Sequence, residues 1–325
     1  MGADRSAAPD PLTWAWDALR GLGRFPTADP VEVKDRPWSR VVRLPTGAGP
    51  VWLKVNRGGT TYEPALVSLL AHLVPGAVEA PLASRGPWWL SADGGPTLRA
   101  SRGDAPLTGQ EMAAVLAEYA VLQQASAEAL PTLLDAGVPD LRPEHLPSLL
   151  RGLLDDQEWM RVGLEGGMPE TTYRRLLARL PEVDEACERL AGSPVPMCVQ
   201  HDDLHDNNVF AGTDAGGTRS YRIFDWGDAS VGHPFATLLV SLRSFATARS
   251  VPVDDPAVLA PRDAYLACWS ELASMEDLAA DADLAVRLAP IGRALSWRRA
   301  LLDAEGAERA RWGANVWGWL EELLV

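Results

Sequence analysis

Several patterns that mark other protein classes are missing from this sequence of 325 residues. No apolar run approaches the roughly 20 residues that a membrane-spanning helix needs. The segment from Met1 to Asp10 contains two aspartates and no apolar stretch, so we do not expect a secretory signal. The three cysteines, at positions 187, 198 and 268, lie far apart and form no C-x-x-C pattern. This spacing predicts reduced thiols in a cytoplasmic protein, rather than a disulfide framework or a zinc site.

Lysine is almost absent. Lys34 and Lys54 are the only two, so 28 of the 30 basic residues are arginines. The lysine ammonium is compact and mobile, and the planar arginine guanidinium does not replace it at every site. A lysine that remains in such a chain is therefore a candidate for a specific role.

Positive charge is also scarce in most of the chain, whose formal net charge is −14. Residues 1–95 hold 10 basic and 9 acidic side chains, a balance of +1, whereas residues 96–325 hold 20 and 35, a balance of −15. This distribution argues against a nucleic-acid partner, because phosphates require a basic footprint. It is compatible with a cationic small substrate, and also with a solvated acidic surface that aids solubility.

The patterning predicts an α+β chain with two unlike lobes. Residues 1–95 are expected to form a small β-rich lobe with a short N-terminal helix and one main helix. Its expected elements are helices over 10–22 and 62–73, strands within 31–44, 51–55 and 88–90, and a hinge at 93–96. Residues 96–325 are expected to form a larger helical lobe. Its expected elements are helices over 108–125, 143–163, 171–191 and 234–323, with turns at Pro252, Pro256, Pro261 and Pro290, and a short β pair of 197–200 with 221–224.

The strongest functional signal is the stretch from His201 to Val209, which fits the kinase catalytic-loop pattern H-x-D-L-x-x-x-N. Asp225-Trp-Gly follows at the place where a kinase has its D-F-G. In phosphoryl transfer the loop aspartate, here Asp203, would accept or orient the proton of the attacking hydroxyl. Asn208 and Asp225 would supply oxygen ligands to Mg²⁺. His201 would orient the loop backbone.

Other charged residues near these motifs have less specific interpretations. Asp228 is either a further metal ligand or a turn residue. Asp202 and Asp206 are expected to be exposed loop charges. The group Asp155, Asp156 and Glu158 suits either a polyamine ligand or a solvated helix face.

Lys54 lies in the strand Val51-Trp-Leu-Lys-Val55, where a kinase needs a cation for the nucleotide phosphates. Glu63, in the first turn of the next helix, is the expected partner that holds this lysine, with Glu79 as the alternative. Additional weak phosphate contacts are expected from Lys34, Arg36 or Arg40.

The segments VQHDDLHDNNVF and YRIFDWGDAS resemble the aminoglycoside phosphotransferase family. The segments VWLKV, YEPALVSLLAHL and WWLSADGGPTLRAS resemble its lysine strand, its short helix with the paired glutamate and its hinge. The resemblance implies a protein-kinase-like bilobal fold, with ATP or GTP in the cleft and its base near the hinge backbone at Ser91 and Ala92.

Three departures from the family pattern stand out. Asp202 replaces the usual glycine of H-G-D, and the expected loop between the first two strands, around 35–40, has no glycine. The segment after Asp225 leads directly to Gly232-His-Pro234 and a helix, with no long activation loop and no A-P-E. This last feature argues against a protein kinase.

The expected activity is transfer of the γ-phosphate of ATP or GTP to a small-molecule hydroxyl with Mg²⁺. An antibiotic such as an aminoglycoside, and a cationic acceptor more generally, are the leading expectations for the substrate. The alternatives are a kinase of a primary metabolite, such as an amino alcohol or sugar, and a catalytically silent nucleotide-binding protein. We predict no membrane or nucleic-acid partner. The tryptophans near the end of the chain, Trp297, Trp312, Trp317 and Trp319, are expected to be packing anchors rather than a binding platform.

Overall fold

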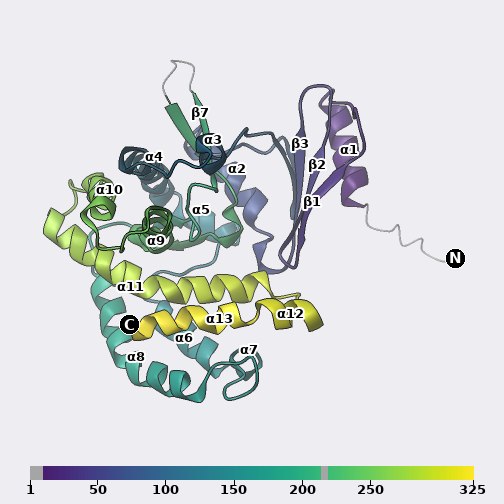
Figure 1. Ribbon diagram of the computed structural model, residues 1–325. Coiled ribbons are helices and arrows are strands. Elements are labelled where there is room, and N and C mark those ends of the chain that lie inside the picture. The colour runs from purple at the N-terminus through teal and green to yellow at the C-terminus, as the bar shows by residue number, and fades with distance from the viewer. Residues whose placement is uncertain (1–9, 214–218) are drawn as a thin grey trace.

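The computed structural model describes residues 10–213 and 219–325. A five-stranded antiparallel sheet forms the N-terminal lobe, and the C-terminal lobe is mostly helical (Figure 1), which confirms the predicted α+β fold class. The order of the sheet strands is β1-β2-β3-β5-β4. Their bounds are Val31–Arg36 (β1), Ser39–Leu44 (β2), Val51–Asn56 (β3), Ala83–Arg85 (β4) and Trp88–Ala92 (β5).

Strand β3 shows how the sheet positions Lys54. Successive side chains of a strand point to opposite faces. Val51, Leu53 and Val55 are buried in a small core beneath helix α1 (Pro11–Gly21). Lys54 lies on the opposite face of the strand, which is the face that meets the rest of the molecule. The alternation of apolar and polar residues therefore directs the lysine toward the cleft.

Helix α2 (Glu63–Leu73) packs into the larger core rather than into the core under α1. Its buried side chains Leu66, Val67 and Leu70 belong to the same apolar cluster as Tyr119 and Trp226 of the C-terminal lobe. This packing places Glu63, in the first helical turn, at the centre of the molecule.

Three long helices dominate the C-terminal lobe: α4 (Gly109–Glu128), α8 (Glu170–Ala191) and α11 (Met275–Ala300). Helix α4 begins after Thr108, which forms a capping box with Glu111. The remaining α-helices are α3 (Leu98–Arg102), α5 (Leu130–Asp135), α6 (Leu146–Asp155), α7 (Gln157–Met160), α9 (Leu238–Arg249), α10 (Pro256–Ala267), α12 (Gly306–Trp312) and α13 (Ala314–Gly318). The short 3₁₀ helices are η1 (Gly58–Thr60), η2 (Trp226–Asp228), η3 (Pro234–Thr237) and η4 (Trp319–Leu324). Among the described residues, no helix has the length and apolar character needed to span a membrane.

Two predictions about these helices are wrong. The helix expected over 143–163 is divided into α6 and α7 at Asp156, whose carboxylate caps α7 by accepting from the Trp159 amide at 3.4 Å. Pro261 and Pro290 lie inside α10 and α11 instead of in turns. Both prolines are buried, so side-chain packing outweighs the cost of about 3 kcal/mol that proline imposes on a helix interior.

The expected β pairing around the catalytic loop is also wrong. Strand β6 (Cys198–Gln200) pairs with β9 (Ser230–Gly232), and β7 (Val209–Thr213) pairs with β8 (Arg219–Ile223). The two predicted strands are present, but each has a different antiparallel partner. As a result, the loop that begins at His201 connects two separate ribbons.

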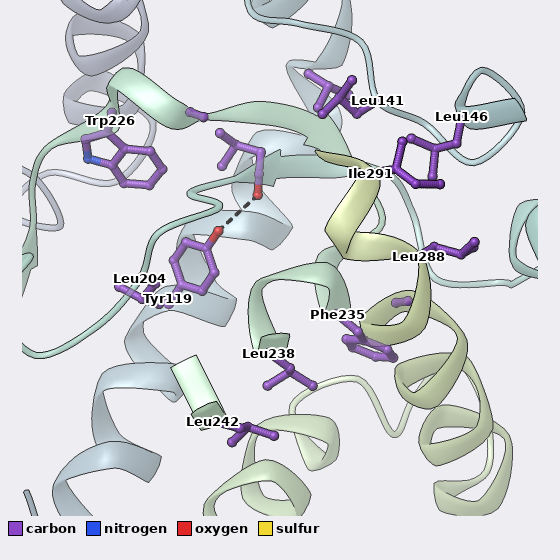
Figure 2. Packing of buried hydrophobic residues seen from close by; sticks show 14 of the residues in the cluster. Tyr119, Leu141, Leu146, Leu204, Trp226, Phe235, Leu238, Leu242, Leu288 and Ile291 are labelled. Atoms are coloured by element: carbon purple, nitrogen blue, oxygen red, sulfur yellow. Dashed lines mark hydrogen bonds between the residues drawn. The ribbon is translucent and has the colours of Figure 1, made fainter. Parts of the chain in front are cut away.

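The larger core supports this loop from below. Figure 2 shows Tyr119, Trp226 and Leu204 together on one side of this core, with Phe235, Leu238 and Ile291 further along it. The Tyr119 hydroxyl donates to the Val199 carbonyl oxygen at 3.3 Å, the bond that is dashed in Figure 2, and accepts from the His201 amide at 2.8 Å. Helix α4 therefore anchors the start of the loop by direct hydrogen bonds.

Candidate active site

His201 is completely buried and holds the loop through both of its ring nitrogens. Its Nε2 donates to the Phe224 carbonyl oxygen at 2.8 Å, and its Nδ1 accepts from the Asp203 amide at 3.3 Å. Burial lowers the pKa of His201, which keeps the ring neutral at physiological pH. The ring therefore links the catalytic loop to the segment that precedes Asp225.

Asp203 is surrounded by groups that stabilise its carboxylate. Asn208 donates its Nδ2 to Oδ2 at 3.3 Å and to the Asp203 carbonyl at 3.0 Å, while Arg293 Nη2 lies 3.3 Å from Oδ1. His205 Nε2 lies 3.6 Å from Oδ2. Burial favours the protonated form, but His205 and Arg293 outweigh it and lower the pKa of Asp203. The side chain is 32% exposed, so a substrate can reach the carboxylate.

Lys54 joins the two lobes through a pair of carboxylates. Its Nζ lies 2.8 Å from Glu63 and 2.6 Å from Asp225. Burial opposes the charge on the lysine, but Asp225 and Glu63 together raise the pKa of Lys54. The alternative partner Glu79 lies 3.4 Å from Arg222 instead. Glu63 is therefore the glutamate that positions Lys54.

The buried Glu63 is fixed by more than the lysine. It is 0% exposed, and its Oε1 also accepts from the Trp226 amide at 2.9 Å. Burial raises the pKa of Glu63, with the Lys54 ammonium acting in the opposite direction. One carboxylate thus ties strand β3, helix α2 and the Asp225 segment together.

Asp225 and Asn208 present the oxygen atoms that Mg²⁺ prefers. Asp225 has a left-handed backbone (φ +64°), and 41% of its side chain is exposed. The Lys54 ammonium lowers the pKa of Asp225. Asn208 uses its Nδ2 on Asp203, which orients the amide and leaves its Oδ1 as the atom suited to a cation. Among the described residues, no group of three or more His, Cys, Asp or Glu residues is arranged as a metal site.

Asp228 is engaged by protein groups on both carboxylate oxygens. Its Oδ2 accepts from Arg293 Nη1 at 3.0 Å, and its Oδ1 accepts from Ser296 Oγ at 2.6 Å. Arg293, on α11, therefore lies between Asp228 and Asp203. Sequence reasoning did not find Arg293, because it follows the loop by about 90 residues and belongs to no motif.

The site lines a cavity of about 230 Å³ between the lobes. Lys54, Asp203 and Asp225 all face it, together with Lys34, Trp38, Asn56, Thr60, Gly227, Asp228, Arg293, Trp297 and Ala300. Of the three weaker phosphate candidates, Lys34 reaches this cavity, whereas Arg40 pairs with Glu32 at 2.7 Å. Ser91 and Ala92 are not among the lining residues; they pair with Trp52 and Val51 in the sheet.

The turn between β1 and β2 has an aromatic contact in place of glycines. Trp38 packs edge-on against Trp297 (5.6 Å between ring centroids) and Trp312 (5.7 Å), and the latter two rings stack on each other. Figure 1 shows α12, which carries Trp312, beneath one end of the sheet. Trp297 and Trp312 pack against Trp38 and against each other, as predicted, and Trp297 also lines the cavity.

The segment after β5 requires a glycine at position 94. A Cβ there would lie 2.3 Å from the Phe210 ring, and that ring stacks on Phe224 with centroids 4.0 Å apart. Arg222 Nη2 donates to the Gly94 carbonyl at 2.9 Å. Strands β7 and β8 therefore pack directly against the expected hinge.

Two aspartates of the loop, which were expected to be exposed, are largely buried. Asp206 is only 13% exposed and binds Arg99 at 2.6 Å. Asp202 is 8% exposed, with a left-handed backbone (φ +61°), and its Oδ2 accepts from Ser230 Oγ at 2.5 Å. Glycine adopts this conformation without strain, and aspartate is one of the few other residues that tolerate it. The Ser230 hydrogen bond gives the buried carboxyl a partner, which the sequence did not reveal.

Replacing Asp202 with asparagine should change how stability depends on pH. Burial raises the pKa of Asp202, so the folded state binds its proton more tightly than the unfolded state. The unfolding free energy of the natural chain therefore falls as pH rises through this pKa. We expect the stability of Asp202→Asn relative to the natural chain to increase as the pH rises above about 4, the ordinary pKa of an aspartate, measured by urea unfolding. If the unfolding free energies of Asp202→Asn and of the natural chain changed with pH in the same way, the raised pKa of Asp202 would be contradicted. Asp155→Asn, at an exposed position, is the control.

Comparison with known proteins agrees with the family resemblance found in the sequence. The model of the phosphotransferase enzyme family matches residues 38–273. Among curated protein sequences, none matches. The solved structure of the GDP and kanamycin complex of APH(2")-IIia is similar, with a TM-score of 0.61 and 14% identity over 96% of this chain and 97% of that one.

Two further solved structures share the fold. The macrolide 2'-phosphotransferase MphH from Brachybacterium faecium has a TM-score of 0.56 and 20% identity over 93% of this chain and 97% of that one. Plasmodium vivax ethanolamine kinase has a TM-score of 0.64 and 9% identity over 98% of this chain and 92% of that one. At these identities the likeness shows a shared fold.

Proposed function

Because the chain belongs to the phosphotransferase enzyme family, we propose that it transfers the γ-phosphate of ATP or GTP to a hydroxyl of a small molecule. One observation carries this proposal: Lys54 lines a single cavity with Asp203 and Asp225, although about 150 residues separate the lysine from these aspartates. These are the cation, the base and the metal ligand that phosphoryl transfer needs.

In the proposed mechanism Asp203 orients the acceptor hydroxyl and takes its proton as the oxygen bonds to the γ-phosphorus, while the bond from that phosphorus to the β–γ bridging oxygen breaks and the nucleoside diphosphate leaves. The low pKa of Asp203 keeps it ionised before the reaction, and Asn208 and Arg293 hold it in place. Lys54, held by Glu63, neutralises the nucleotide phosphates. Lys34, at the same cavity, is a second candidate for phosphate contact.

Asn208 and Asp225 are the proposed ligands of Mg²⁺, which would neutralise charge on the phosphates when bound. For Asp228 we now favour a different role from metal binding. Both of its oxygens are engaged, and it holds Arg293 beside Asp203. The nucleotide base is proposed to lie near the backbone of Ser91 and Ala92, and the GDP of the APH(2")-IIia complex supports a purine nucleotide as donor.

The test is consumption of ATP or GTP in the presence and absence of Mg²⁺ and of hydroxyl acceptors. The panel should include antibiotics and primary metabolites, because the similar structures include both antibiotic phosphotransferases and an ethanolamine kinase. Acceptor-dependent consumption would support the proposal. Nucleotide binding without transfer to any acceptor would instead favour the catalytically silent alternative.

Replacing Asp225 with asparagine should raise the Mg²⁺ concentration needed for half-maximal activity by about tenfold or more, since even partners of metal ligands contribute 10- to 100-fold to metal affinity. Asparagine tolerates the left-handed backbone at this position, so the local fold should persist. The measurement is a Mg²⁺ titration at saturating nucleotide. Asp206→Asn, with its carboxylate on Arg99, is the matched control. An unchanged Mg²⁺ requirement in Asp225→Asn would remove Asp225 from the metal site.

A further inference from the structure

A second cavity, of about 420 Å³, opens beside the catalytic aspartate. Among the described residues that line the two cavities, Asp203 is the only one they share. A base that serves a phosphate donor on one side must receive the acceptor hydroxyl from another. The second cavity is therefore positioned to hold the acceptor.

One face of helix α9 forms most of this cavity. Val240, Arg243, Ser244, Thr247 and Ala248 all line it, and their spacing of three, four, seven and eight residues places them on one side of a helix. The remaining lining residues are Arg99 from α3, Trp319 from η4, and Asp203.

The charges at this cavity are the reverse of the charge of the lobe as a whole. Arg99 and Arg243 line it, and Asp203 is the only carboxylate among the described lining residues. Asp206 and Glu322, which pair with these arginines at 2.6 Å and 3.0 Å, do not line it. Each arginine thus has an acidic partner that does not line the cavity, and the described lining residues carry no excess of negative charge.

Trp319, in the same wall, is itself in contact with two arginines. The guanidinium of Arg243 lies 5.6 Å from the centre of its ring, and that of Arg293 lies 5.4 Å from it. The negative face of this indole is thus already engaged by protein cations. A ligand ammonium in this cavity would meet two arginines and a single carboxylate.

The acidic group expected to suit a polyamine does not serve the cavity. Asp156 binds Arg298 at 2.7 Å, and Glu158 binds Arg309 at 2.6 Å. Neither these two residues nor Asp155 line it. Their contacts stabilise the packing of α7 against the last helices.

From this geometry we propose that the acceptor is an oxygen-rich hydroxyl compound with a largely apolar surface, uncharged or anionic, and not a polyamine. Val240, Ala248 and Trp319 would contact its apolar surface. Arg243 and Arg99, with Ser244 and Thr247, would donate hydrogen bonds to its carbonyl, ether or carboxylate oxygens. This inference rests on the proposed phosphotransfer by Asp203 and narrows its substrate class.

The test compares acceptors of different charge in the nucleotide-consumption assay, with direct binding measured by calorimetry on the nucleotide-loaded protein. The probes are kanamycin as the polycation, erythronolide B as a largely apolar, uncharged macrolactone with several hydroxyls, and chloramphenicol as an uncharged alcohol. We expect kcat/KM for at least one of the last two to exceed that for kanamycin by about 100-fold, since an unpaired charge costs several kcal/mol. A preference for kanamycin would overturn the inference. So would the absence of binding and of phosphate transfer for each of the two apolar probes.

A matched pair of variants locates the acceptor. Ala248→Trp, at an exposed position on the cavity wall, should raise the acceptor KM by at least about tenfold and far more than it raises the nucleotide KM. Ala267→Trp, exposed on α10, should leave both unchanged. Equal effects of the two substitutions would contradict the acceptor site. If the protein neither binds nor hydrolyses nucleotide, the proposed phosphotransfer itself is contradicted. If it binds and hydrolyses nucleotide but prefers kanamycin, only the inference about the acceptor is contradicted.

Discussion

Replacing Asp203 with asparagine should lower kcat by about 10²- to 10⁴-fold, the range that a positioned general base contributes. The substitution removes the proton acceptor but keeps the shape of the side chain. Asn208 and the His201 ring would still hold the loop backbone, through the Asp203 carbonyl and amide. We therefore expect the folded structure and the nucleotide KM to change little. The measurement is steady-state phosphate transfer to any active acceptor, with the unfolding midpoint recorded in parallel.

The adjacent aspartate offers a matched control for this substitution. Asp202→Asn makes the same chemical change one residue away, but its side chain points to Ser230 rather than into the cavity between the lobes. Its kcat should stay within a few-fold of the natural chain. Turnover by Asp203→Asn at a similar level would mean that Asp203 is not the base.

Replacing Lys54 with methionine should affect both stability and catalysis. Glu63 is 0% exposed, and removal of its cation leaves a buried carboxylate without charge compensation. We expect a loss of about 3 kcal/mol in the free energy of unfolding, because breaking a buried ion pair from one side is strongly destabilising. Turnover should fall by about 10²-fold or more, as it does when a charge-stabilising group is removed from an active site.

The double variant Lys54→Met with Glu63→Gln separates these two effects. Glutamine is uncharged and keeps an oxygen that can accept from the Trp226 amide. The double variant should recover most of the lost stability, since Asp225 is 41% exposed and tolerates the loss of its partner better. Its turnover should remain as low as that of the single variant. Recovery of activity along with stability would show that Lys54 acts only in folding. Urea unfolding and nucleotide-consumption rates measure the two quantities.

Short-range patterns predicted the strands and helices well, but they did not predict which strands pair. The segments 197–200 and 221–224 read as strands because they are apolar and bounded by turn residues. Their true partners, Ser230–Gly232 and Val209–Thr213, are short segments with no stronger signal than other loops. Strand pairing depends on contacts between distant segments, and those contacts are not encoded in the local period of a sequence.

Burial was the second property that local reasoning missed. Asp202 and Asp206 look like ordinary loop charges in a chain rich in aspartate. Asp202 is buried because Ser230 and the loop backbone enclose it, and Asp206 is largely covered because Arg99 binds it. Each of these partners lies outside the loop motif.

The sequence by itself determined the family, the two-lobe fold class and the residues that line the inter-lobe cavity at Lys54, Asp203 and Asp225. It could do so because phosphoryl transfer requires particular side chains at particular spacings along a loop and a strand. Only the tertiary structure brought Arg293 and Trp38 to that cavity and revealed the arginines of the second one. These residues come from helices and a turn whose positions depend on packing over the whole chain. The acidic composition suggested a cationic acceptor. The local charge of the second cavity instead favours an uncharged or anionic one, because the fold decides which side chains lie beside Asp203.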